Sequence, residues 1–201
     1  ARRLQDPLAE LVKIEPKAIG VGQYQHDMKP ARLDEALTGV VEDCVNSVGV
    51  DLNTASPSLL KYVAGITSAT AKNIVLFREE NGAFTSRAQL KKVKGLGPKA
   101  FEQCAGFLRI PGGKEILDNT GVHPESYAAA KKLMKLFDIN EKKLTETADI
   151  EKLTQSYGIA KAADECETGI PTLEDIVAEL KKPGRDIRDD FAQPILRDDV
   201  L

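Results

Sequence analysis

Tryptophan is absent from the 201-residue sequence, and aromatic residues make up only 5% of it. Alanine, leucine, lysine and glutamate dominate instead, and because these residues lose little rotamer freedom in a helix, the composition favours helix over sheet. No run of about 18 apolar residues occurs, so the sequence predicts no membrane-spanning helix. The first residues, ARRLQDPLAELVKIEP, do not resemble a secretory signal peptide, and with no Met at position 1 we expect an excised piece of a longer protein.

Patterns typical of metal binding and catalysis are also scarce. Cys44, Cys104 and Cys166 lie about sixty residues apart without a CxxC pair, so they have no zinc-ligand spacing and cannot form a complete disulfide set. We expect reduced core cysteines in a cytoplasmic protein. His26-Asp27 suggests a general base or a metal-binding pair, but no second cluster of carboxylates or histidines accompanies it. Without a phosphate-binding loop, nucleophile elbow or metal motif, we expect no enzyme, no cofactor and no metal site.

A tandem repeat organises the middle of the chain. The first copy covers residues 56–80 and the second covers residues 86–110, here called the first and second hairpins. Aligning them places Leu60 on Leu90 and Gly65 on Gly95, with a constant offset of 30 residues. Each copy is predicted to form a short helix, a glycine-bearing turn and a second helix, which is the form of a helix-hairpin-helix unit.

The turn of the second hairpin, Lys94-Gly95-Leu96-Gly97-Pro98-Lys99, has the composition of a phosphate site. Gly95 and Gly97 permit positive φ and a close approach of backbone to a ligand, and Pro98 suits the first position of the next helix. The free amides near Gly97, Lys99 and Ala100 would then face a nucleic-acid phosphate, with Lys94 and Lys99 beside it. Leu96 is expected to point inward and hold the two helices together. Lys91 and Lys92 add further positive charge.

The first hairpin departs from this pattern. Its turn is Gly65-Ile66-Thr67-Ser68, with Thr67 where the second hairpin has Gly97, and Ala64 in place of Lys94. Thr67 or Ser68 can cap the next helix, so the turn still forms, while its approach to phosphate is less favourable. Lys72 and Arg78 remain as candidate contacts. We therefore expect one stronger phosphate site and one mainly structural partner.

Helical periodicity extends to both sides of the repeat. Apolar spacing predicts a helix at 33–48 ended by Gly49, and Asn53 or Ser56 is expected to cap the helix that begins at Pro57. Further predicted elements are a helix at 2–13, a strand at 18–22, helices at 123–137, 140–147 and 149–157, and a helix capped by Thr172 and ended by Pro183-Gly184. The fold class is therefore mainly α.

Charge is unevenly distributed along a chain whose formal net charge is −3. Residues 84–109 contain six basic residues, Arg87 and Arg109 among them, and one acid. Residues 138–179 contain eleven acids and four lysines. A local field of each sign influences partner choice more than the total does.

Several separate blocks resemble the Tex family of bacterial transcription accessory proteins. They are GVGQYQHDM (20–28), VEDCVNSVGVDLNTAS (41–56), the first hairpin, NGAFTSRAQLKKVKGLGPKAFEQCAGFLRI (81–110), HPESY (123–127) and GIPTLEDIVAELKKPGRDIRDDF (169–191). The resemblance implies that a YqgF (ribonuclease-H-like) domain precedes this stretch and an S1 domain follows it. Residues 1–30 would then end an α/β YqgF domain with a helix and a strand, 31–112 would form the tandem helix-hairpin-helix domain, 113–185 a second helical domain of that type, and 186–201 a linker toward S1.

Two functions follow from these observations. The first is a non-catalytic module that binds RNA or DNA through backbone phosphates, independently of sequence, within a transcription accessory protein. The second is an architectural scaffold that positions the YqgF and S1 domains and binds protein partners in the transcription machinery, for which the acidic 138–179 segment offers a surface. The sequence does not distinguish RNA from DNA or single from double strands.

Overall fold

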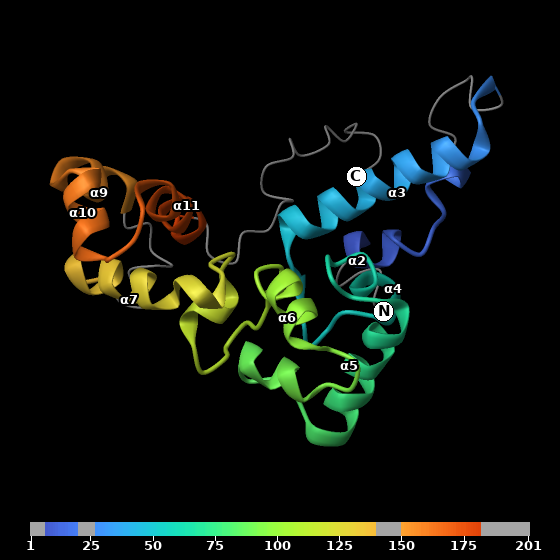
Figure 1. Ribbon diagram of the computed structural model, residues 1–201. Coiled ribbons are helices and arrows are strands. Elements are labelled where there is room, and N and C mark those ends of the chain that lie inside the picture. The colour runs from blue at the N-terminus through green and yellow to red at the C-terminus, as the bar shows by residue number, and fades with distance from the viewer. Residues whose placement is uncertain (1–6, 20–26, 140–149, 182–201) are drawn as a thin grey trace, which may run out of the picture.

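The computed structural model describes residues 7–19, 27–139 and 150–181, and these are mainly helical (Figure 1). The α-helices are α2 (Pro7–Leu11), α3 (Pro30–Val48), α4 (Pro57–Leu60), α5 (Ser68–Asn81), α6 (Pro98–Cys104), α7 (Tyr127–Leu136), α9 (Ile150–Tyr157), α10 (Ile159–Glu165) and α11 (Ile170–Leu180). Short 3₁₀ helices are η1 (Pro16–Ile19), η3 (Arg87–Lys92), η4 (Ile116–Asn119) and η5 (Pro124–Ser126). Strands β1 (Val50–Asp51) and β2 (Leu108–Arg109) form the one sheet among the described residues.

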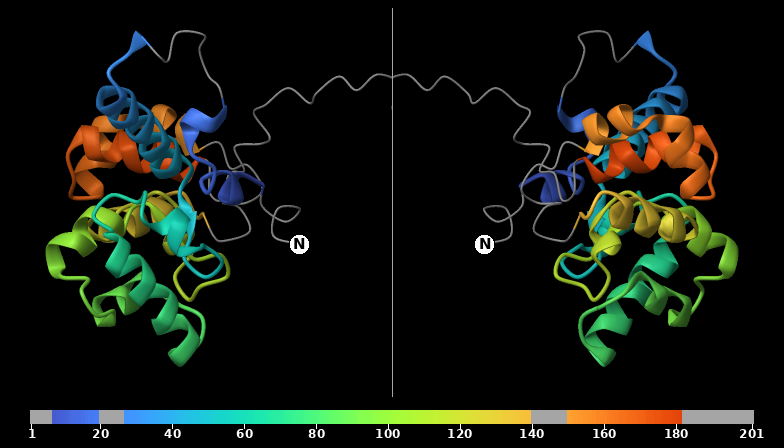
Figure 2. Two further views of the ribbon diagram at one scale, coloured as in Figure 1. Left: turned by 90° about the vertical axis from the view of Figure 1, so that its right-hand side faces the viewer. Right: turned by 90° about the vertical axis from the view of Figure 1, so that its left-hand side faces the viewer.

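Two hydrophobic cores hold these elements. The first draws its buried residues from the segment between Val45 and Ile110, and the second from the segment between Leu117 and Leu180. In Figure 1 the first core lies among α3 to α6, and the second among α7 and α9 to α11. Figure 2 shows α3 along the upper side of the molecule and α5 at the lower side, so the hairpins lie below the long helix.

The helix predicted at 33–48 is confirmed as α3, which begins three residues earlier at Pro30. It ends where expected, since Gly49 takes φ +79° and its amide donates to the Val45 carbonyl. Asn46 then joins α3 to the first hairpin: its side chain donates to the Tyr62 carbonyl and accepts from the Ala64 amide, at 3.2 and 3.1 Å.

The hairpins form with the predicted order of elements. Ser56 caps α4 by accepting from the Leu59 amide, and Pro57 takes the first helical position. The other candidate cap, Asn53, instead pairs with both backbone groups of Phe84, at 2.7 and 3.0 Å.

The two strands pair the segment before the first hairpin with the end of the second hairpin. β1 and β2 pair in parallel, with Val50 opposite Leu108 and Asp51 opposite Arg109. The second helix of the second hairpin therefore ends at Cys104 and does not continue to the end of the aligned copy.

Predictions outside the repeat have mixed outcomes. The helices predicted at 123–137 and 149–157 are confirmed as η5 with α7 and as α9, whereas α10 was not predicted. Thr172 is not a cap: α11 begins at Ile170, with Gly169 as its N-cap and Pro171 in the first turn, where proline is favoured. The strand predicted at 18–22 is wrong for its first two residues, which lie in η1. The rest of that strand, and the helix predicted at 140–147, lie outside the described residues.

A buried arginine connects the two cores. Arg87 is only 1% exposed. Its guanidinium donates to the carbonyls of Leu108 (2.7 Å), Val122 (2.8 Å) and Thr120, and to the Tyr127 hydroxyl (2.9 Å). Arg87 therefore supports the junction instead of contributing to the surface charge of the second hairpin.

Asp118 completes this network from the second core. One carboxylate oxygen accepts from the Arg87 amide at 3.0 Å and the other from the Tyr127 hydroxyl at 2.6 Å. Burial is the main cause of the raised pKa of Tyr127, so its phenol remains a hydrogen-bond donor. The junction thus places complementary charge and hydrogen bonds around Arg87, which makes the burial of its charge tolerable.

Candidate nucleic-acid interface

The turn of the first hairpin packs tightly against the second hairpin. Gly65 has φ +77°, and a Cβ there would lie 2.7 Å from the Cβ of Gln103 and 3.0 Å from the carbonyl oxygen of Ala100, both on or beside α6. A side chain at position 65 would therefore be strained by its backbone and would collide with α6. Gly65 serves the packing of the two hairpins.

The turn of the second hairpin packs reciprocally against α5. A Cβ at Gly95 would lie 3.6 Å from Asn73 Nδ2 and 3.8 Å from Thr70 Oγ1. Asn73 also donates to the Lys94 carbonyl at 2.8 Å, and Thr70 to the Gly95 carbonyl at 3.4 Å. Thr70 and Asn73 stand 30 positions before Ala100 and Gln103, so each turn contacts equivalent positions of the other hairpin.

The helix starts that follow the two turns differ. Thr67 caps α5, and its hydroxyl accepts from the Thr70 amide at 3.2 Å. Gly97 caps α6 without a side-chain hydrogen bond. At the start of α5, one backbone amide is thus already hydrogen-bonded to the capping side chain. The backbone amides at the start of α6 have no side-chain acceptor.

Gly97 does not adopt the conformation expected of it. Positive φ occurs at Gly95 (+84°), but Gly97 has φ −76° and ψ 174°, an extended conformation open to any residue. A Cβ at Gly97 would meet nothing within 4 Å. What Gly97 contributes is therefore the open space before α6 and not backbone strain.

Four lysines lie within eight residues of this helix start in the sequence. Lys91, Lys92, Lys94 and Lys99 are all exposed. The Lys91 ammonium lies 4.7 Å from the centroid of the Phe101 ring, a cation–π contact. Over the described parts of the chain, none of the four lies within ion-pair distance of a carboxylate. The positive charge of the second hairpin is thus available to an anion.

The remaining candidate residues of the second hairpin have structural positions. Leu96 is 5% exposed and belongs to the first core, which confirms the expectation that it points inward. Ala100 is half-buried against that core. Beside them lies a hollow of about 370 Å³, lined by residues of α6 and by the segment at His123. At its edge, His123 Nε2 lies 2.9 Å from the Glu102 carbonyl oxygen.

The candidates of the first hairpin are less well placed. Ser68 and Lys72 are exposed on α5, the former in its first position. Arg78 is half-buried near the other end of α5 and donates to the Leu52 carbonyl at 3.1 Å. Thr67 and Gly65 are engaged in capping and packing. The structure therefore leaves the lysines of the second hairpin exposed, while Arg78 stabilises the fold.

Asn73 joins the first hairpin to the second, a contact that sequence reasoning missed. Its amide positions the Lys94 backbone, and the offset of 30 residues from Gln103 was a usable signal for it. Elsewhere in the described residues no group of three or more His, Cys, Asp and Glu side chains is arranged to hold a metal ion. No described helix has the length and apolar character needed to cross a membrane.

Comparison with known families agrees with this geometry. Residues 45–109 match the helix-hairpin-helix motif, and residues 115–188 match the HHH domain. The chain is therefore a protein with two tandem helix-hairpin-helix regions.

Longer proteins have similar sequences over this stretch. The transcriptional accessory protein Tex of Neisseria gonorrhoeae is 55% identical over 193 residues, and protein YhgF of Escherichia coli K12 is 53% identical over 200 residues. These alignments cover 95% and 100% of this chain, and 25% of each relative. The human S1 RNA-binding domain-containing protein 1 is 38% identical over 255 residues, again with 25% of its length covered. The chain is homologous to these proteins, one of which is named Tex, and spans about a quarter of their length.

Proposed function

We propose that this chain is a non-catalytic module that binds the phosphate backbone of RNA or DNA through its second hairpin. The observation that carries the proposal is the set of exposed lysines in the second hairpin, none of which lies within ion-pair distance of a carboxylate among the described residues. The start of α6 also has no side-chain cap, while the equivalent start of α5 is capped by Thr67. The names of the relatives support this class of function, since they include a transcriptional accessory protein and a protein with an S1 RNA-binding domain.

The chemistry of the site favours contact with backbone and not with bases. Lysine ammonium groups and helix-start amides bind phosphate oxygens, which carry no direct sequence information. Each phosphate neutralised by a lysine releases condensed counterions, so log affinity falls linearly with log salt. Binding is therefore expected to be independent of sequence and strongly dependent on salt.

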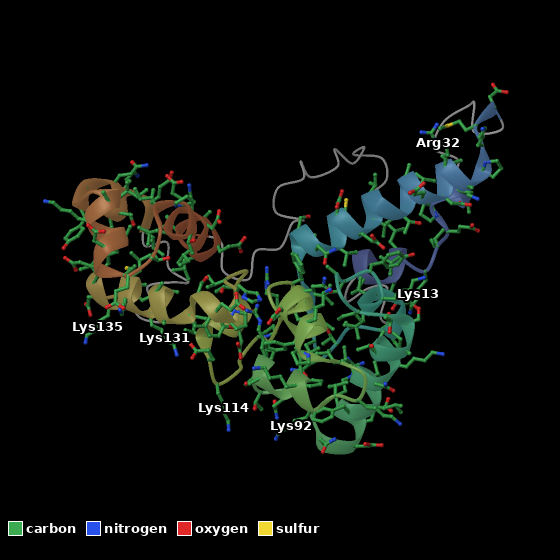
Figure 3. All side chains as sticks on the ribbon, in the orientation of Figure 1. Lys13, Arg32, Lys92, Lys114, Lys131 and Lys135 are labelled. Atoms are coloured by element: carbon green, nitrogen blue, oxygen red, sulfur yellow. The ribbon has the colours of Figure 1, made fainter. Side chains whose placement is uncertain are left out.

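The first test is a salt titration of fluorescence anisotropy with single- and double-stranded RNA and DNA. Lys94→Gln/Lys99→Gln is expected to reduce affinity about tenfold at low salt and to make the salt slope shallower by about 1.5, since two phosphate contacts are lost. Lys29→Gln/Arg32→Gln, at the start of α3, is the matched control because it removes the same charge from exposed positions. Figure 3 shows Arg32 at the far end of α3 from the second hairpin.

The outcomes separate the two candidate functions. Equal losses in the two double variants would show that overall charge, and not the second hairpin, governs binding. Negligible binding by the folded wild-type chain to all four nucleic acids would overturn the proposal and leave the scaffold function as the alternative.

A further inference from the structure

A row of exposed lysines continues from the second hairpin to α7, a helix of the second core. Lys92, Lys114, Lys131 and Lys135 project from the lower side of the molecule in Figure 3, from η3, the loop between β2 and η4, and α7. We call these four residues the lysine row. All except Lys92 lie after the second hairpin.

A backbone hydrogen bond and an ion pair connect the members of this row. The Lys114 amide donates to the Thr85 carbonyl at 2.9 Å, which places Lys114 beside the start of the second hairpin. The neighbouring Glu115 receives the Lys131 ammonium at 2.5 Å, which brings α7 to the same loop. Lys131 and Lys135 are four residues apart on α7 and therefore share one face of that helix.

The charges of the row are only partly neutralised. Glu115 pairs with Lys131. For Lys92, Lys114 and Lys135 the described residues provide no ion-pair partner, and all three side chains are exposed. The other lysine of α7, Lys132, pairs with Glu167 from beyond α10. The free positive charge thus continues past the hairpin as far as α7, ahead of the acidic 138–179 segment.

The Arg87 network holds the two ends of the row in a fixed relation. Arg87 begins η3, which carries Lys92, and contacts Tyr127, which begins α7. Three backbone carbonyls and the Asp118 carboxylate complete the buried junction. A surface that crosses a fixed junction is preorganised, so a ligand that contacts both sides does not lose affinity in ordering it.

We propose that the nucleic-acid contact continues from the second hairpin across the Arg87 junction to α7, along the lysine row. This inference rests on the proposed function and extends it: the ligand is a strand long enough to follow the backbone from Lys92 through Lys114 to Lys135. A row of basic side chains that follows a backbone in this way suits sequence-independent binding.

The test uses the full 201-residue chain with oligonucleotides of about 6 and about 20 nucleotides, chosen around the size range of single binding sites. Lys114→Gln/Lys135→Gln is compared with Lys94→Gln/Lys99→Gln and with the control Lys29→Gln/Arg32→Gln. Lys131 is left unchanged because its ion pair with Glu115 would confuse the result. Circular dichroism and thermal unfolding establish that each variant retains its fold.

For the long oligonucleotide, Lys114→Gln/Lys135→Gln is expected to weaken binding about tenfold at low salt and to make the salt slope shallower by about 1.5. For the short oligonucleotide, the same variant is expected to bind like wild type, while the hairpin variant is weakened for both lengths.

Two results would overturn the inference alone: a hairpin variant that weakens binding while the row variant binds the long oligonucleotide like wild type, or a row variant that weakens both lengths equally. Absence of wild-type binding to either length would overturn the proposed function as well.

Discussion

At the residue scale, Cys104 shows how the first core controls a titratable group. Its side chain is fully buried, and Sγ lies 3.7 Å from the Phe101 carbonyl oxygen. Burial raises the pKa of the Cys104 thiol from 9.0 to about 11, because the thiolate would lose its hydration. The folded chain therefore keeps this thiol protonated at pH values where the unfolded chain ionises it.

This difference predicts a loss of stability in alkali. A pKa that is raised in the folded state gives stability that is fully present below pH 9 and lost as the pH rises toward 11. We expect the free energy of unfolding to fall between pH 8.5 and 10, with Cys104 contributing a slope that approaches about 1.4 kcal/mol per pH unit. Denaturant unfolding at a series of pH values measures the slope.

Cys104→Ala provides the comparison for this prediction. The variant is less stable at every pH because it leaves a cavity, but its alkaline slope is expected to be shallower than that of wild type. Cys44→Ala is the control, since Cys44 is exposed. Identical slopes in wild type and Cys104→Ala would show that the thiol does not contribute.

At the scale of the elements, glycines at two non-equivalent positions of the turns have separate roles. Gly65 has positive φ and contacts α6, whereas Gly97 has extended backbone and open space before it. The same substitution, glycine to alanine, therefore tests packing at one position and ligand access at the other.

Gly65→Ala is expected to destabilise the fold by about 1–3 kcal/mol, through positive φ and the contact with Gln103 and Ala100. Gly97→Ala is expected to change stability by less than about 1 kcal/mol, because alanine is only a somewhat poorer N-cap. It places a methyl group before α6 and should weaken nucleic-acid binding severalfold. Denaturant unfolding and anisotropy measure the two effects, and a Gly97→Ala variant that binds like wild type would contradict the access role.

The predictability of these elements depends on the range of the interactions that form them. The helix at 33–48, the cap at Ser56 and the paired turns have local signals in apolar spacing, capping residues and repeated glycines. The pairing of β1 with β2 joins residues almost sixty positions apart, and two-residue strands have no periodicity to detect. The conformation of Gly97 was also beyond the sequence, because glycine permits both signs of φ.

At the scale of the whole molecule, the least predictable feature is the junction between the cores. Arg87 resembles its exposed neighbours Lys91 and Lys92 in the sequence, yet it is buried by groups 21 to 40 residues further along the chain. Arg109 is likewise half-buried, and burial lowers the pKa of its guanidinium to about 10. Counting charges along the sequence therefore overestimated the positive surface of the second hairpin by two residues.

Arg87→Met is the prediction that tests the junction. It removes the buried guanidinium and leaves the carbonyls of Leu108, Thr120 and Val122 and the Tyr127 hydroxyl without that donor, while the backbone amide of residue 87 still donates to Asp118. Breaking a buried charged network in this way costs about 3–5 kcal/mol, so denaturant unfolding should show a loss of that size. Hydrogen exchange should rise most at residues 117–128, which contact the guanidinium from the second core.

Lys92→Met is the matched control, because Lys92 lies in the same 3₁₀ helix with its side chain exposed. Its stability should remain within about 0.5 kcal/mol of wild type. If Arg87→Met also weakens binding of the long oligonucleotide more than that of the short one, the junction aligns the lysine row. Equal stability of the two variants, with unchanged exchange at 117–128, would show that the two cores are held together by contacts other than the Arg87 network.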